Sequence, residues 1–403
     1  MKNLRFISYL LALTAFAFVS CDDDNDGPGV LPTGQSKTFA LSSVADAAIS
    51  GTATFNALDD GSTAIELMLN GTPDGGSHPA HIHFNTAAEG GDIAVTLTSV
   101  DGSTGMSTTI VTATDDGTPL TSDDLLDFDG YINVHLSADD LATLVAQGDI
   151  GQNELTGMSK GFALASVADP DISGMATFAE RVNGETLVTL ALENTPADGM
   201  HPAHIHFNTA AEGGGIAVTL GTVDGNTGMS KTNVTMLDDG SMMFSYDDLL
   251  EFDGYINVHL SAADLGTLVA QGDIGQNELT GTSMTYDLNA VDVAGVSGTV
   301  EFMERVNGET LVEISLMGTT FAGDHPSHIH LGSVAEAPGA IAVTLTRVNT
   351  MGVSKTNVTI LDDESMMLSY DDLIAFDGYI NVHNSAADLG TLVAQGDIGA
   401  NGN

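Results

Sequence analysis

All twelve histidines of this chain belong to one pattern that occurs three times. In each copy, three histidines lie in an H-P-x-H-I-H segment, and a fourth ends an I-N-V-H segment further along the chain. The copies contain His78, His81, His83 and His135, then His201, His204, His206 and His259, and finally His325, His328, His330 and His383. Imidazole is the commonest protein ligand for metal ions, so the repeated cluster indicates a metal site in each copy.

The spacing within a copy predicts which imidazoles meet. His81 and His83 are two residues apart, so on a β-strand they share one face, while Ile82 points to the opposite, apolar face. His135 alternates in the same way with Val134 in the later segment. If the two segments are neighbouring strands, the rings of His81, His83 and His135 converge on the outside of the sheet. The expected ligand sets of the other copies are His204, His206 and His259, and His328, His330 and His383.

The first histidine of each copy has a different setting, because it precedes a proline that fixes the entry to the strand. Two roles are open for it. It is either a fourth metal ligand or a residue that orients a ligand ring and fixes its tautomer. The residues concerned are His78, His201 and His325.

Three nitrogen donors on rigid strands suit copper or zinc. The motif contains no carboxylate and no cysteine, which disfavours calcium and a structural zinc site. Copper, as Cu(I) with three nitrogens or as tetragonal Cu(II), is therefore the expected ion, with zinc as the alternative, at about one ion per domain. Two interpretations without a metal remain: a buried histidine cluster held by hydrogen bonds, and a pH sensor whose imidazoles protonate near pH 6.

Each copy shows the pattern of short β-strands, because runs rich in Val, Ile, Thr and Phe alternate with Gly, Asp and Asn turns. The sequence Ser245–Phe252 predicts one helical turn, and Arg181 and Arg305 are expected at hairpins with Asn-Gly turns. We therefore expect an all-β chain of three tandem Greek-key antiparallel sandwich or barrel domains. The strands predicted in the second copy are Lys160–Ser166, Ser173–Glu180, Thr186–Asn194, Ala203–Asn208, Ile216–Val223, Ser230–Thr235, Gly254–His259 and Leu268–Ile274.

The repeats divide the chain into three domains, each large enough to bury a core of its own. Their predicted limits are 36–155, 156–279 and 280–403. The sequence GQNELTG occurs at both junctions, at 151–157 and at 275–281, so the domains are expected to lie close together in a row.

The N-terminus has the order of a targeting segment. Lys2 and Arg5 precede an apolar run that is short for a membrane span, which predicts a signal peptide over 1–20. Cys21, the only cysteine of the chain, follows it and resembles the lipidation site of a bacterial lipoprotein. The acidic tether over 21–35 resembles a surface-export signal. The segment therefore predicts a lipid anchor in the outer membrane or at the cell surface, with an ordinary secretory signal as the alternative.

The formal net charge is −46 at pH 7. A chain this acidic repels nucleic acid and anionic lipid headgroups, so the expected partners are metal ions and, through the lipid on Cys21, the membrane. Protein partners cannot be read from the sequence. Because Cys21 is the only cysteine, no disulfide can join the domains, and packing must stabilise them.

The segments HPAHIH, DGYINVH and LVAQGDIG together resemble the CHRD domain, a module of chordin and of many bacterial secreted proteins. The resemblance extends over nearly all of the mature chain, three times over. It implies an immunoglobulin-like or barrel-like β fold, and it implies no particular activity.

A weaker resemblance links the same segments to copper–zinc superoxide dismutase, which has an H-x-x-H-x-H strand and a later V-H. It implies that the three expected ligands of each copy match copper ligands and that His78 matches a histidine that is not a ligand. Thr143, Thr267 and Thr391 lie near the place of that family's anion-guiding arginine, and no histidines remain for a second metal. We therefore expect copper binding or sequestration rather than catalysis. The alternatives are a copper-only dismutase-like enzyme and a structural or adhesive surface module.

Overall fold

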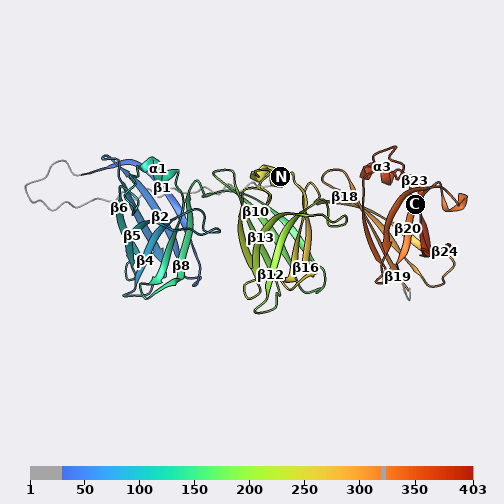
Figure 1. Cartoon of the computed structure of the whole chain (residues 1–403), viewed down its shortest axis with the longest axis horizontal. Helices are drawn as coiled ribbons and strands as arrows, with labels where there is room; N and C mark the ends of the chain where they lie inside the picture. Colours follow the sequence, from blue (N-terminus) through green and yellow to red (C-terminus); the bar gives the residue numbers. More distant parts are fainter. Residues whose placement is uncertain (1–29, 319–323, 403) are drawn as a thin grey trace, which may run out of the picture.

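The computed structural model describes residues 30–318 and 324–402. The predicted signal peptide, Cys21 and the acidic run of the tether lie outside these residues. The described part forms three β domains in a row (Figure 1). Its first strand begins at Pro32, slightly before the predicted start of the first domain. Within the described part, no helix has the length and apolar character that crossing a bilayer requires.

Eight antiparallel strands and one short helix make up each domain, which confirms the all-β prediction. The first contains β1 (Pro32–Ser43), β2 (Ser50–Leu58), β3 (Thr63–Asn70), β4 (Ser77–Phe84), β5 (Ile93–Asp101), β6 (Met106–Val111), α1 (Ser122–Leu126), β7 (Asp129–Ser137) and β8 (Asp140–Gly151). The second contains β9 (Leu155–Ser166), β10 (Ser173–Arg181), β11 (Thr186–Glu193), β12 (Met200–Phe207), β13 (Ile216–Asp224), β14 (Met229–Val234), α2 (Tyr246–Leu250), β15 (Asp253–Ser261) and β16 (Asp264–Gly275). The third contains β17 (Leu279–Ala290), β18 (Ser297–Arg305), β19 (Thr310–Met317), β20 (His325–Leu331), the 3-10 turn η1 (Val334–Glu336), β21 (Ile341–Val348), β22 (Val353–Val358), α3 (Tyr370–Ile374), β23 (Asp377–Ser385) and β24 (Asp388–Gly399).

A Greek key in each domain brings the two histidine segments together. Strands β4, β5 and β6 pair in succession, and β7 returns through α1 to pair with the other edge of β4. The equivalent pairs are β12 with β15 and β20 with β23. The sequence prediction that the H-P-x-H-I-H and I-N-V-H segments are neighbouring strands is confirmed.

The first two domains are closed barrels, whereas the third is an eight-stranded sheet in the same order that does not close. In the first barrel the ring closes through one residue pair, Asp101 with Met106. The Asp101 carboxylate stabilises the intervening turn by accepting the backbone N–H groups of Ser103 and Thr104. The turn of the third domain is shorter and begins with Asn349. The Asn349 N–H donates to the Val353 carbonyl, and the Asn349 side-chain oxygen accepts the Val353 N–H, but no residue pair of the ladder joins β21 to β22 among the described residues.

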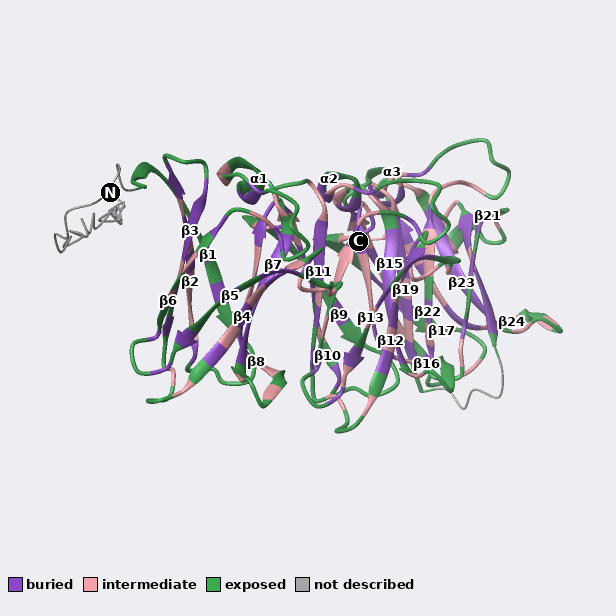
Figure 2. Ribbon diagram, turned by 60° about the vertical axis from the view of Figure 1, so that its left-hand side comes forward, coloured by how far each residue is buried: buried purple, intermediate pink, exposed green. Residues whose placement is uncertain are grey.

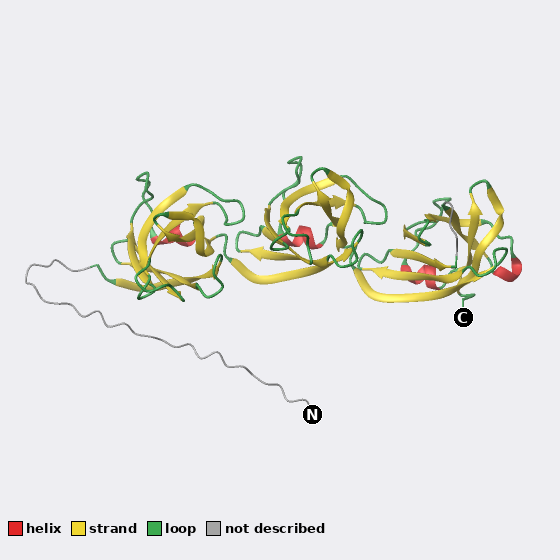
Figure 3. Ribbon diagram, turned by 90° about the horizontal axis from the view of Figure 1, so that it is seen from below, coloured by secondary structure: helices red, strands yellow, loops and turns green. Residues whose placement is uncertain are grey.

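The inner face of each sheet forms a separate apolar core (Figure 2). Ile82, Ile132 and Val134 are all 0% exposed in the first core. The short helix lies over one end of each domain (Figures 1 and 3), and Leu125 of α1 is likewise 0% exposed. Alternating residues of β4 and β7 therefore face the core, and the intervening histidines face outward.

Candidate metal centre

The register of β4 and β7 explains why three imidazoles meet outside the barrel. His81 lies opposite Asn133 and His83 lies opposite Tyr131, while the core residue Ile82 lies opposite Ile132. On the outer face, His135 is therefore diagonal to His81, because residues of one face alternate along a strand. The same register is present in the second and third domains.

The predicted ligand sets converge in all three domains. One ring nitrogen of each of His81, His83 and His135 lies within 4.8 Å of the others, and the same holds for the equivalent histidines of the second and third domains. In the first domain, His81 Nδ1 lies 3.1 Å from His135 Nε2. The His81 and His83 rings are nearly perpendicular, at 87°. Each domain could therefore hold one metal ion on three nitrogens.

Backbone carbonyls fix the tautomers of two of the three rings. His83 Nδ1 donates to Gly91 O at 2.9 Å, and His135 Nδ1 donates to Leu141 O at 2.6 Å. A neutral imidazole has one N–H, so both Nε2 atoms carry lone pairs. A carbonyl partner on the other ring nitrogen is the usual arrangement of a metal-binding histidine.

Within the converging set of the first domain, the His83 Nε2 atom lacks a partner. It is buried and has no hydrogen bond, and the same is true of Nε2 in His206 and His330. A buried polar atom without a partner is costly, and a metal ion at this point would satisfy it. The residues present therefore fit a metal ion with nitrogen preference.

The third domain repeats the arrangement with one difference. His330 Nδ1 donates to Gly339 O at 3.0 Å and His383 Nδ1 donates to Leu389 O at 2.8 Å, as in the other domains. His328 Nδ1, however, makes no hydrogen bond to His383. It is buried without a partner, so this site has two nitrogen atoms that lack one.

Burial lowers the pKa of His81 below its ordinary value of 6.5, and the nearby rings of His135 and His83 lower it further. Asp115 opposes this shift. Burial likewise lowers the pKa of His135, against the effect of its hydrogen bond to the Leu141 carbonyl. A lowered pKa favours the neutral ring, which is the form that binds metals.

His78 lies apart from the converging atoms. Its ring is 1% exposed, and Nδ1 lies 3.2 Å from the backbone oxygen of His135. His201 and His325 make the same contact with His259 and His383. The converging set of nitrogens in each domain does not include this histidine. It contacts instead the main chain of the strand that carries the last histidine of the set.

Sequence reasoning missed an aromatic ring beside the site. Tyr131 stacks on His83, with ring centroids 4.9 Å apart and planes 17° apart. Tyr255 and Tyr379 stack on His206 and His330 in the same way. The D-G-Y-I-N-V-H segment contained the signal. Tyr131 and His135 are an even number of residues apart, so on a strand both side chains lie on the same face.

The immediate surroundings of the triad are acidic. Thr143, near the place where the dismutase-like pattern has an arginine, donates its hydroxyl to Asp140 at 2.9 Å. Asp115 accepts the backbone N–H of Thr96, the residue that lies opposite His81 in the sheet. Among the described residues, no lysine or arginine forms an ion pair with either aspartate.

The donor set itself limits the chemistry of the centre. Three imidazole nitrogens from β4 and β7 are compatible with copper and with zinc, and their geometry does not select between the two. No protein-family model matches this chain, and no similar protein is found among curated proteins or among solved structures.

Proposed function

We propose that the protein binds copper, one ion per domain, and serves in copper sequestration or delivery at the cell envelope. The observation that carries the metal part is the buried Nε2 of His83, His206 and His330, which has no hydrogen-bond partner and belongs in each domain to a group of three converging imidazoles. Cations also suit a chain with a net charge of −46.

Copper is favoured over zinc by the character of the donors. The site offers three neutral nitrogens and no carboxylate or thiolate, which suits three-coordinate Cu(I) or tetragonal Cu(II). Copper also binds more tightly than zinc to a given nitrogen site. Bound copper would be held by His81, His83 and His135 in the first domain, and by their equivalents in the others.

Binding is favoured over catalysis by the acidic surroundings. Asp115 and Asp140 lie close to the triad, and neither forms an ion pair with a cation among the described residues. An anionic substrate such as superoxide would meet a repulsive potential. The resemblance to the copper site of a dismutase supports the choice of metal more than it supports that reaction.

Attachment to the envelope is proposed from the sequence. The signal-like segment, Cys21 and the acidic tether support a lipid anchor, and the resemblance to CHRD domains supports an extracytoplasmic location. Under this proposal, expression of the full chain yields a protein in the membrane fraction that incorporates labelled palmitate. Cys21→Ala abolishes the labelling, and labelling that survives this change excludes the anchor.

Metal binding is tested by measuring how many copper ions each chain holds. After loading with Cu(II) and removal of excess ion, elemental analysis is expected to give about three copper ions per chain, one for each triad. The combined variant His83→Ala, His206→Ala and His330→Ala is expected to bind none with high affinity. If it still binds three, the assignment of the ligands is wrong.

The matched control replaces the three histidines that do not converge. The variant with His78→Gln, His201→Gln and His325→Gln keeps all triads, so it is expected to retain about three copper ions, with at most a weaker affinity. Near-zero stoichiometry of the unaltered protein would remove the copper proposal altogether.

A further inference from the structure

The junction between the first two domains contains a buried arginine. Arg181, at the end of β10, is 1% exposed and reaches back into the first domain. Its Nη1 donates to Asp149 Oδ2 at 2.8 Å and to the backbone oxygen of Asn153, and its Nε donates to Asn233 Oδ1 within the second domain. These hydrogen bonds join the two domains, because Asp149 and Asn153 belong to the first domain and Arg181 to the second.

The next junction repeats this arrangement. Arg305, at the end of β18, is also 1% exposed and donates to Asp273 Oδ2 at 2.8 Å and to the backbone oxygen of Asn277. In the first domain the corresponding residue is Leu58, which is 8% exposed. The strand end therefore accepts either a leucine or an arginine, and the arginine is present where a domain is docked against it.

Asp149, which accepts the hydrogen bond from Arg181, also accepts one from a loop beside the metal centre. Asp149 Oδ1 accepts the backbone N–H of Ala87 at 2.8 Å, and Ala87 lies in the connection between β4 and β5. The same connection contains Gly91, whose carbonyl accepts the Nδ1–H of His83. Asp149 therefore lies between the guanidinium of one domain and the loop that orients a histidine of the other.

Two further contacts act on the same loop and ring. Asn233 of the second domain donates to Glu89 at 3.3 Å, and Glu89 in turn accepts the backbone N–H and the hydroxyl of Thr86. Asp149 also lies directly opposite Tyr131, the residue that stacks on His83. The second domain therefore touches the support of His83 through two residues, and the hydrogen bonds and ring contacts of the converging imidazoles described above all lie within the first domain.

We propose that Arg181 and Arg305 are positioning residues for the metal site of the preceding domain, so that docking of each domain tightens the site before it. This inference rests on the proposed function, since it assigns regulation to the same triads. Arg181 acts on His83 through Asp149 and the loop 85–92. Arg305 acts on His206 through Asp273, which accepts the backbone N–H of Ala210 in the equivalent loop.

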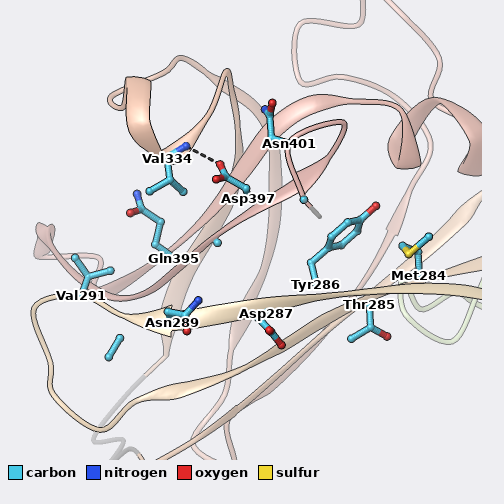
Figure 4. A pocket seen from close by; sticks show the side chains of 13 residues that line it. Met284, Thr285, Tyr286, Asp287, Asn289, Val291, Val334, Gln395, Asp397 and Asn401 are labelled. Carbon is cyan, nitrogen blue, oxygen red and sulfur yellow. Dashed lines mark hydrogen bonds between the residues drawn. The ribbon is translucent and has the colours of Figure 1, made fainter.

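The third domain supplies an internal comparison. Asp397 accepts the backbone N–H of Val334, just as Asp149 accepts that of Ala87 (Figure 4). No arginine pairs with Asp397 among the described residues, and Asp397 and Asn401 instead line a cavity of about 860 Å³. The loop that follows His330 is therefore held by contacts within its own domain, from Asp397, Asn401 and Tyr379, without an arginine among the described residues. We expect the third site to be the most weakly preorganised.

The test uses the full chain with one triad left intact. His206→Ala with His330→Ala leaves the first site, and His83→Ala with His330→Ala leaves the second. Arg181→Leu, chosen because the first domain has a leucine at this position, is added to each, and Cu(II) affinity is measured by competition with a chelator. We expect the first site to weaken roughly 2- to 30-fold and the second site to stay unchanged.

The crossed design separates positioning from a folding defect. Arg181 belongs to the second domain, so mere damage to that domain would weaken the second site, and this outcome overturns the proposal. Unchanged affinity at both sites overturns it as well. Arg305→Leu is the matched variant, and it is expected to weaken the second site while sparing the first.

A readout without metal keeps the proposal testable if copper does not bind. In the metal-free protein, the ¹⁵N resonances of the His83 ring report the hydrogen bond from Nδ1 to Gly91. Arg181→Leu is expected to shift them and to leave those of His206 in place. Absence of copper binding would refute the proposed function, whereas unshifted His83 resonances would refute the positioning role.

Discussion

At the scale of single residues, the centre depends on atoms that hold the ligands as much as on the ligands. Backbone carbonyls fix the protonated nitrogens of His83 and His135, and Tyr131 fixes the plane of the His83 ring. Such neighbours of a ligand typically change metal affinity by about 10- to 100-fold when they are removed. The site is therefore defined by its surroundings as well as by its three nitrogens.

The stacked tyrosine gives the first prediction. Tyr131→Leu removes the ring that packs on His83, and it is expected to weaken copper binding at the first site by about 10-fold or more. Tyr131→Phe keeps the stacked ring and is expected to stay within a few-fold of the unaltered protein. Competition titrations of chains with only the first triad intact measure both affinities. Equal losses in the two variants would assign the effect to the hydroxyl group instead.

The lowered histidine pKa values predict how the metal-free protein responds to acid. The unfolded chain takes up protons as the pH falls through about 6.5, whereas buried rings such as His81, His204 and His328 do so only at lower pH. The contribution of these neutral rings to stability is therefore fully present above about pH 6.5, and it is lost as the pH falls toward their pKa values in the folded protein. Melting temperatures measured between pH 7.5 and pH 5 are expected to decline.

A matched variant isolates this effect. Replacing His81, His204 and His328 by Gln removes one such group from each domain and is expected to make the decline shallower, while His135, His206 and His383 still contribute. The many carboxylates with lowered pKa values titrate below 3.8 and do not contribute in this window. A melting temperature that rises on acidification would contradict the assignment of neutral, buried rings.

At the scale of elements, the Greek-key connection brings the two histidine strands together, and the short helix covers one end of the barrel. Thr121 caps α1 by accepting the backbone N–H of Asp124, whose carboxylate accepts that of Thr121. The helix then directs Leu125 into the core and leaves Leu126 at 37% exposure. Because α1 lies in the return from β6 to β7, its packing also positions the strand that carries His135.

These two leucines form a matched pair for the next prediction. Leu125→Ala opens a cavity in the core and is expected to destabilise the first domain by about 2–5 kcal/mol. Leu126→Ala removes an exposed side chain and is expected to change stability by about 0.5 kcal/mol or less. Urea unfolding followed by hydrogen exchange of first-domain amides measures both. Similar losses of stability in the two variants would show that packing of Leu125 in the core does not anchor α1 to the barrel.

The sequence predicts most of the element pattern and part of the site. All eight strands and the helical turn predicted in the second domain are present, because alternating apolar residues report directly on burial. Convergence of His81, His83 and His135 was also predictable from the period of two. The carbonyl partners Gly91 and Leu141 were not, because Gly91 lies in the β4–β5 connection and Leu141 at the start of β8, and the approach of each to its histidine depends on tertiary packing.

The arginines show the limit of local reasoning most clearly. The Asn-Gly turn after Arg181 is present, with a hydrogen bond from the N–H of Gly184 to the carbonyl of Arg181. Nothing in the hairpin pattern indicates, however, that the side chain crosses into the previous domain to reach Asp149. A charge that is buried at a junction resembles a solvated surface charge in sequence, since only its partner in another domain distinguishes the two.

At the scale of the whole molecule, charge sets how the protein meets other charged species. The chain contains 55 acidic and 9 basic residues, and two of the arginines are buried at the junctions. The potential around the row of domains is therefore negative nearly everywhere, including beside each triad. Approaching cations are attracted, and approaching anions are repelled, over about a Debye length.

This field gives the last prediction, which also decides between copper binding and dismutation. If the copper-loaded protein reacts with superoxide at all, repulsion between like charges makes the encounter slow at low salt. Raising the ionic strength from about 0.01 M to about 0.15 M shortens the Debye length from roughly 30 to 8 Å, so the rate constant is expected to increase. Pulse radiolysis measures it, and reduction of the bound Cu(II) by an uncharged reductant, which is expected to be insensitive to salt, serves as the control. A fast rate that falls with added salt would require a local cationic guide near Thr143, and it would identify the protein as a dismutase rather than a copper carrier.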